Sequence, residues 1–128
     1  FKSSHLDNSL ISEGCIINAK AIKKSVIGNR SRIGEGTVIE NSYIMGNDFY
    51  QSLTDMKEDI ENENQLIGIG ERCYINHALV DKNCRIGNDV YINGGKHLTN
   101  CSEELYCIKD GIVVIKKGKT LPDNFRIE

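Results

Sequence analysis

Aliphatic residues return every six positions through most of this chain, and this period sharply limits the folds available to it. The stretch 26–50 reads VIGNRSRIGEGTVIENSYIMGNDFY, with the recurrence at Ile27, Ile33, Ile39 and Met45. An amphipathic helix repeats its apolar residues every three to four positions, and a half-buried strand repeats them every two. A period of six instead predicts a parallel β-helix, in which each repeat forms one flat face and a sharp corner joins it to the next.

The recurrence continues on both sides of this stretch. Further inward-facing positions are predicted at Leu10, Ile16, Ile22, Ile69, Ile75, Val80, Ile86 and Ile92. Glycine and asparagine fall where corners are expected, and both tolerate the left-handed backbone that such corners require. The sequence therefore predicts one all-β domain over residues 1–128, a single-stranded solenoid of hexapeptide repeats.

The repeat is interrupted at residues 47–65. Within this segment Leu53, Met56 and Ile60 recur at helical spacing, and Ser52 precedes Asp55 in the pattern of a helix N-terminal cap. The segment is predicted to be a loop that carries a short helix and leaves the solenoid between two coils.

After Ile92 the regularity fades into a loop at 93–104. Strands are predicted at 105–108 and 111–116, with Val113–Ile115 adding a last strand to the solenoid. Three lysines follow and are predicted to form an exposed rim: Lys116, Lys117 and Lys119.

Composition and charge exclude several classes of function. The net charge of −2 argues against a nucleic-acid or membrane surface, and no apolar stretch is long enough to span a bilayer. The first residues, FKSSHLDNS, lack the pattern of a secretory signal. Five cysteines without a CxxC pair indicate neither a zinc cluster nor a complete disulfide framework, which favours a reducing compartment.

The histidines leave one enzymatic alternative open. Hexapeptide solenoids include acyltransferases in which a histidine acts as general base, and His77 is the only histidine inside the repeat. A zinc site would need convergence of His5, His77 and His97, which lie in three separate parts of the chain. No phosphate-binding glycine motif is present. We predict no catalytic residues and no metal ligands in this chain.

Basic residues near predicted corners suggest a different kind of site. They are Arg30, Arg32, Lys82, Arg85, Lys116, Lys117 and Lys119. In stacked coils, residues far apart in sequence can share one edge, where a few cations could hold a phosphate or sulfate group. The alternative is a solvated rim without a ligand.

Four segments in succession resemble a known family. They are SLISEGCII, SVIGNRSRIGEGTVIENSYIMGNDFYQ, IGIGERCYINHALVDKNCRIGNDV and DGIVVIKKG. This succession resembles the C-terminal domain of glucose-1-phosphate adenylyltransferase, which forms ADP-glucose and pyrophosphate from ATP and glucose 1-phosphate for glycogen or starch synthesis. The resemblance implies a left-handed parallel β-helix, although crossover connections in sheets are otherwise strongly right-handed. It also implies that the N-terminal nucleotidyltransferase domain, with its Mg²⁺, lies outside this chain.

The resemblance further implies partners and site residues. It predicts a tetramer, contacts with the catalytic domain, and an anionic effector that is a sugar phosphate, phosphoglycerate or phosphate. The effector lysines of the family fall on Lys82 and Lys117, and Arg85 and Arg30 match basic family positions. The domain itself needs no cofactor, and the protein is expected in the bacterial cytoplasm or the plastid stroma. A free-standing acyltransferase and a ligand-free solenoid adaptor remain the alternatives.

Overall fold

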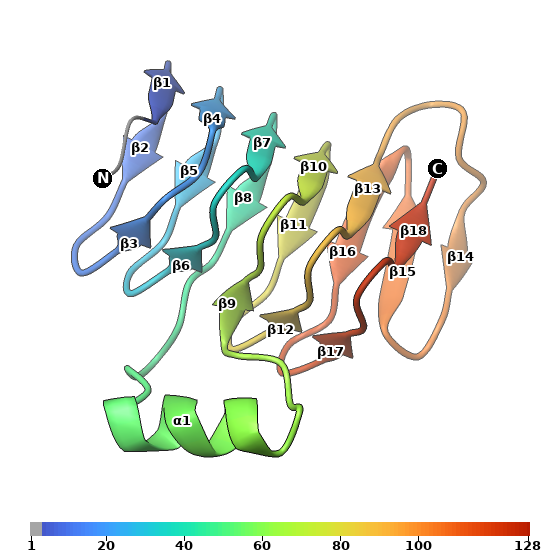
Figure 1. Cartoon of the computed structure of the whole chain (residues 1–128). Helices are drawn as coiled ribbons and strands as arrows, with labels where there is room; N and C mark the ends of the chain where they lie inside the picture. The colour runs from blue at the N-terminus through green and yellow to red at the C-terminus, as the bar shows by residue number, and fades with distance from the viewer. Residues whose placement is uncertain (1–3) are drawn as a thin grey trace.

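The chain is a parallel β-helix in this computed structural model, which describes residues 4–128. The described residues form short strands that wind around one core and one helix, α1 (Leu53–Glu61), that lies outside the solenoid (Figure 1). Three sheets make up the walls, and each coil contributes one strand to each sheet. The predicted all-β solenoid with one inserted helix is confirmed.

The strands of sheet A are all parallel. In spatial order they are β1 (His5–Asp7), β4 (Ala21–Lys23), β7 (Val38–Glu40), β10 (Tyr74–Asn76), β13 (Tyr91–Asn93) and β18 (Arg126–Ile127). Sheet C is also parallel. Its strands are β3 (Ile16–Ile17), β6 (Arg32–Ile33), β9 (Gly68–Ile69), β12 (Arg85–Ile86) and β17 (Thr120–Leu121).

Among the described residues, sheet B alone contains antiparallel strands. Its parallel strands are β2 (Leu10–Ile11), β5 (Val26–Ile27), β8 (Tyr43–Ile44), β11 (Ala78–Val80) and β16 (Ile112–Ile115). Beyond β16 the sheet continues with β15 (Tyr106–Lys109) and β14 (Cys101–Ser102), each antiparallel to its neighbour. The prediction of strands at 105–108 and 111–116 is confirmed. The prediction that Val113–Ile115 forms the last strand is wrong, because β17 and β18 complete one further turn.

Most strands contribute one inward-facing aliphatic residue to the core. The fully buried members of these three columns are Ile17, Ile22, Ile27, Ile33, Ile39, Ile69, Ile75, Ile86, Ile92, Ile115 and Leu121. Partners in each column pair in register, as Ile39 does with Ile75 and Ile75 with Ile92. Nine of the twelve predicted inward positions therefore belong to the core.

Three predicted inward positions, Leu10, Ile16 and Met45, are wrong. Leu10 and Ile16 face outward and are 71% and 58% exposed, whereas Ile17, next to Ile16, is buried. The corner between sheets A and B takes five residues, as from Ile39 to Ile44, so counting in sixes reaches Met45 instead of Ile44. The step from Ile17 to Ile22 is also five residues long. Counting back in sixes from Ile22 therefore reaches Ile16 and Leu10, each one residue before the inward-facing position.

The segment between β8 and β9 leaves the solenoid as predicted. Helix α1 begins with a capping box in which the Ser52 hydroxyl accepts the Asp55 N–H at 3.0 Å, and the Asp55 carboxylate accepts the Ser52 N–H. No residue of α1 is fully buried, and Leu53 and Ile60 remain 85% and 63% exposed. The helical spacing thus predicted the helix correctly, although the described chain covers its apolar residues only in part: Met56 is half-buried, and Leu53 and Ile60 are exposed.

No helix in residues 4–128 is long and apolar enough to cross a membrane.

Candidate functional site

Lys82 and Lys117 lie on the same edge of the solenoid, where sheet B turns into sheet C. Strands β11 and β16 pair in parallel with Val80 opposite Ile115, so the two lysines occupy equivalent positions two residues further on. The Gly118 N–H donates to the Lys82 carbonyl at 2.9 Å, which holds the two corners together. Since hydrogen-bonded neighbouring strands are about 4.8 Å apart, both ammonium groups can reach a single small anion between them. The structure therefore brings together the pair that the sequence predicted.

A carboxylate lies on the next coil of the same edge. Asp48 Oδ1 is 3.2 Å from Lys82 Nζ, and Asn83 Nδ2 donates to Asp48 Oδ2 at 3.0 Å. The hydrogen bond from Asn83, then that from Lys82, lowers the pKa of Asp48, and the charge of Lys117 acts in the same direction. Asp48 belongs to the MGNDFY segment, but sequence reasoning did not assign it to the site because its 34-residue separation from Lys82 conceals their contact.

Arg30 lies on this edge one coil beyond Asp48. Its backbone has a φ of 56°, so it forms a left-handed corner, and its Nε donates to the Asn47 carbonyl at 3.0 Å. Its guanidinium carbon is 6.0 Å from the centre of the Tyr50 ring. Arg30 thus helps to hold the start of the helical loop, with Asp48 between it and the lysine pair.

Arg85 is directed to the helical loop. It lies on β12, and its Nη1 donates to Asp59 Oδ2 at 2.7 Å and to the Gln65 carbonyl at 2.6 Å. Gln51 also contacts this centre, since its Nε2 donates to Asp59 Oδ2 and its Oε1 accepts the Ile67 N–H. Hydrogen bonds from Arg85 and Gln51 lower the pKa of Asp59. In this structure Arg85 therefore fastens α1 to the solenoid, at a place separate from Lys82 and Lys117.

The ion pair between Arg85 and Asp59 should control protection of the helical loop. At neutral pH, Asp59→Asn should make residues 50–65 more susceptible to limited proteolysis, because the loop loses its charged contact with the solenoid. Glu61→Gln is the matched control, because it makes the same charge change at an exposed position of α1. The protease should cleave this variant at the wild-type rate. Since the pKa of Asp59 is lowered in the fold, the contact stabilises the loop at neutral pH and is lost as the pH falls below the ordinary value of 3.8. Equal cleavage of Asp59→Asn and wild type would contradict this role.

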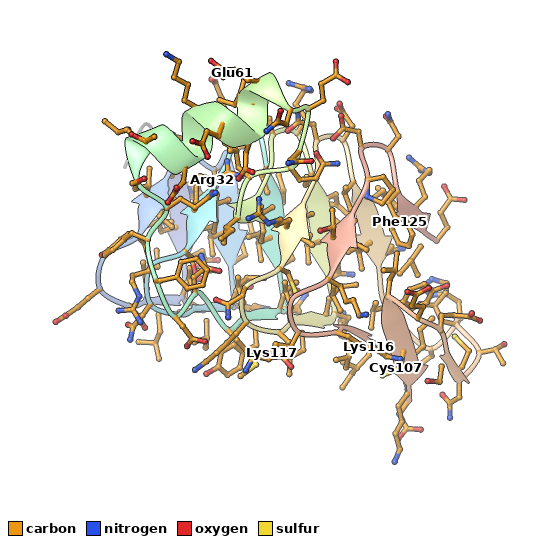
Figure 2. All side chains as sticks on the ribbon, turned by 90° about the horizontal axis from the view of Figure 1, so that it is seen from below. Arg32, Glu61, Cys107, Lys116, Lys117 and Phe125 are labelled. Carbon is orange, nitrogen blue, oxygen red and sulfur yellow. The ribbon has the colours of Figure 1, made fainter. Side chains whose placement is uncertain are left out.

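The other basic residues serve mainly local contacts. Arg32 lies on sheet C beside α1, and its Nε donates to the Ile67 carbonyl at 3.0 Å (Figure 2). Lys116 Nζ donates to the Glu103 carbonyl. Lys117 is exposed and lies away from α1 in the same view. Of the predicted lysine rim, Lys117 is thus the exposed member, while Lys116 and Lys119 are half-buried.

His77 occupies a corner. Its φ is 51°, its side chain is exposed, and its Nδ1 is 3.2 Å from Asn76 Oδ1. The equivalent corners of other coils have Asn8, Lys24 and Asn41, also at positive φ. His77 is therefore one of a series of corner residues. Within residues 4–128, no group of three or more histidine, cysteine or acidic side chains is arranged to hold a metal ion.

Comparison with known proteins identifies the family to which this fold belongs. Residues 1–125 match the model of the GLGC left-handed parallel β-helix domain, which confirms the predicted left-handed turn. A small subunit of glucose-1-phosphate adenylyltransferase from Triticum aestivum, chloroplastic or amyloplastic, is 41% identical over 117 residues. A protein from Arabidopsis thaliana named inactive glucose-1-phosphate adenylyltransferase small subunit 2, chloroplastic, is 35% identical over 127 residues.

These alignments cover 90% and 93% of this chain, but only 25% and 26% of the two relatives. The chain thus spans about a quarter of the length of the curated relatives it matches. The in-register coils, the segment that leaves them after MGNDFY and the match over residues 1–125 together show that this chain belongs to the family of GLGC left-handed parallel β-helix domains.

Proposed function

We propose that this chain is the regulatory and oligomerisation domain of a glucose-1-phosphate adenylyltransferase and is not itself catalytic. The observation that carries the proposal is the pairing of Lys82 with Lys117 on one edge, within the fold of this family. Nucleotidyl transfer from ATP to glucose 1-phosphate would take place in a part of the protein outside this chain. Among the described residues, no group of three or more histidine, cysteine or acidic side chains could hold the Mg²⁺ of that reaction.

The proposed effector is an anion with a phosphate group. Two ammonium groups from adjacent coils can donate to different oxygens of one phosphate, and such charge-assisted hydrogen bonds are the stronger ones. An effector held at this edge and by a neighbouring domain would shift the protein toward its active arrangement by binding that arrangement more tightly.

The outer face of sheet B supports a role in contacts with other domains or subunits. Successive strands place an apolar residue at the same outward position, and these are Leu10, Val26, Tyr43, Leu79 and Val114. Leu10 is 71% exposed, and Tyr43 and Ile112 are each 47% exposed. A continuous apolar face of this kind is characteristic of interaction surfaces. We propose that this face contacts the catalytic domain and other subunits of a tetramer. The protein would work in the plastid stroma or the bacterial cytoplasm.

Replacing either lysine should weaken activation. In a protein that joins this chain to its catalytic region, Lys82→Ala and Lys117→Ala should each raise the effector concentration for half-maximal activation roughly tenfold, since each removes one charge-assisted hydrogen bond. The turnover number without effector should stay at the wild-type value. The measurement is steady-state pyrophosphate release against effector concentration.

Lys57→Ala is the matched control, because Lys57 is an exposed lysine on α1, away from the lysine pair. It should be activated like the wild type. Unchanged activation of both Lys82→Ala and Lys117→Ala would overturn the anion site.

A further inference from the structure

We propose that Asp48 is an intramolecular competitor for the anion site, so that a phosphate binds by displacing its carboxylate from Lys82. This inference rests on the proposed function, because it concerns the same pair of lysines. It adds a residue that sets the affinity of that site and a link between the site and the helical loop.

The geometry places the Asp48 carboxylate where a ligand would bind. Its Oδ1 is 3.2 Å from Lys82 Nζ, and its Oδ2 accepts from Asn83 Nδ2 at 3.0 Å. The Asp48 N–H donates to Asn83 Oδ1 at 2.9 Å, so the backbone and the side chain of Asp48 both face the Lys82 corner. A phosphate that binds close to the Lys82 ammonium therefore approaches the Asp48 carboxylate as well, and repulsion between the two anions favours movement of the carboxylate away from Lys82.

Exposure makes this replacement feasible. The side chains of Lys82 and Asp48 are 42% and 47% exposed, so solvent and ions reach the pair directly. Exposed ion pairs contribute little net free energy. A dianionic phosphate between Lys82 and Lys117 has two ammonium partners and twice the charge of the carboxylate, so it can compete successfully.

Displacement of the Asp48 carboxylate from Lys82 would affect the helical loop, because Asp48 lies near the start of that loop. Asn47, the preceding residue, is buried and joined to Arg30 by hydrogen bonds in both directions, with Arg30 Nε donating at 3.0 Å and the Arg30 carbonyl accepting at 2.8 Å. Tyr50, two residues after Asp48, lies beside the Arg30 guanidinium. An anion at Lys82 would thus release the ion pair between Asp48 and Lys82, while the backbone hydrogen bond from Asp48 to Asn83 and the bonds between Asn47 and Arg30 stay in place.

The test is isothermal titration calorimetry of this chain with inorganic phosphate at constant ionic strength. Asp48→Asn keeps the size and the hydrogen-bonding oxygen of the side chain but removes its charge. It should bind phosphate roughly two- to fivefold more tightly than the wild type, as expected for loss of one exposed ion pair. Asp110→Asn is the matched control, since Asp110 is exposed in the turn between β15 and β16. The phosphate affinity of this variant should equal that of the wild type.

A double-mutant cycle separates competition from general charge repulsion. Lys82→Met keeps the aliphatic stem and removes the ammonium group for which Asp48 competes. In that background Asp48→Asn should no longer tighten phosphate binding, and an equal gain in both backgrounds would overturn competition at Lys82.

The outcomes also separate this inference from the proposed function. If Lys82→Met and Lys117→Met weaken phosphate binding but Asp48→Asn binds like the wild type, the role of Asp48 is wrong and the anion site stands. If neither lysine variant changes phosphate binding, the anion site fails, and the role of Asp48 fails with it.

Discussion

Ile75→Ala is expected to lower the free energy of unfolding by about 2–5 kcal/mol, the usual cost of truncating a buried isoleucine. Ile75 has no exposed surface and pairs in register with Ile39 on one side and Ile92 on the other. Truncation removes apolar contacts with both neighbouring coils and leaves a cavity that flat, hydrogen-bonded strands cannot close. Urea unfolding followed by circular dichroism would measure the loss.

Ile16→Ala is the matched control because a strict six-residue period predicts Ile16 as a core residue. In the structure it is 58% exposed on the outside of sheet C, so its truncation should change the free energy of unfolding by less than about 0.5 kcal/mol. A loss at Ile16 as large as that at Ile75 would mean that Ile16, and not Ile17, faces the core.

Gly70→Ala is expected to destabilise the fold by about 3 kcal/mol, at the upper end of the cost of overpacking. A Cβ atom on Gly70 would lie 2.5 Å from the Gly87 carbonyl oxygen and 2.7 Å from its carbonyl carbon. A Cβ on Gly34 would likewise lie 2.5 Å from the backbone of Gly70. These three glycines stack in successive coils, and an added methyl group would force adjacent backbones apart along the whole edge.

Gly118→Ala isolates the other effect of losing a glycine. Gly118 has a φ of +72°, but a Cβ there would meet no atom within 4 Å. Its replacement should therefore cost only about 1 kcal/mol, the penalty for a left-handed alanine. Thermal or urea unfolding of the two variants would compare the cost of steric overlap with that of backbone strain. Equal losses would show that close approach of the coils at Gly70 is not the controlling factor.

Sequence alone was sufficient for the architecture because each coil needs the same inward residue three times. Ile27, Ile33 and Ile39 are one coil of that repeat, and all three are buried without any exposed surface. The capping residues Ser52 and Asp55 likewise marked the start of α1 correctly, since capping depends on neighbours only three residues apart. Local chemistry was enough in both cases.

The register was less predictable where two aliphatic residues stand together. In Leu10–Ile11 and Ile16–Ile17, neighbouring side chains point to opposite faces of the strand, and Met45 directly follows Ile44 at the end of β8. The period cannot distinguish such neighbours when some corners take five residues and others six. The hairpin of β14 and β15 was also predicted only in part, because antiparallel extension of sheet B depends on pairing with β16.

The candidate site was also predictable only in part. The resemblance to the family selected Lys82, Lys117, Arg85 and Arg30, but it could not show which of these residues lie close together. Lys82 and Lys117 lie at equivalent positions on adjacent coils because the segment between β13 and β16 leaves the coil and returns, so that Ile115 pairs beside Val80. Arg85 instead contacts Asp59 on α1.

The sequence by itself thus determined the solenoid, its helical loop and the residues to consider for an anion site, because these depend on local periodicity and short motifs. Only the tertiary structure decided which aliphatic neighbour faces the core and that Asp48 contacts Lys82. The physical reason is that stacking places residues of different coils about 4.8 Å apart, whatever length of chain separates them.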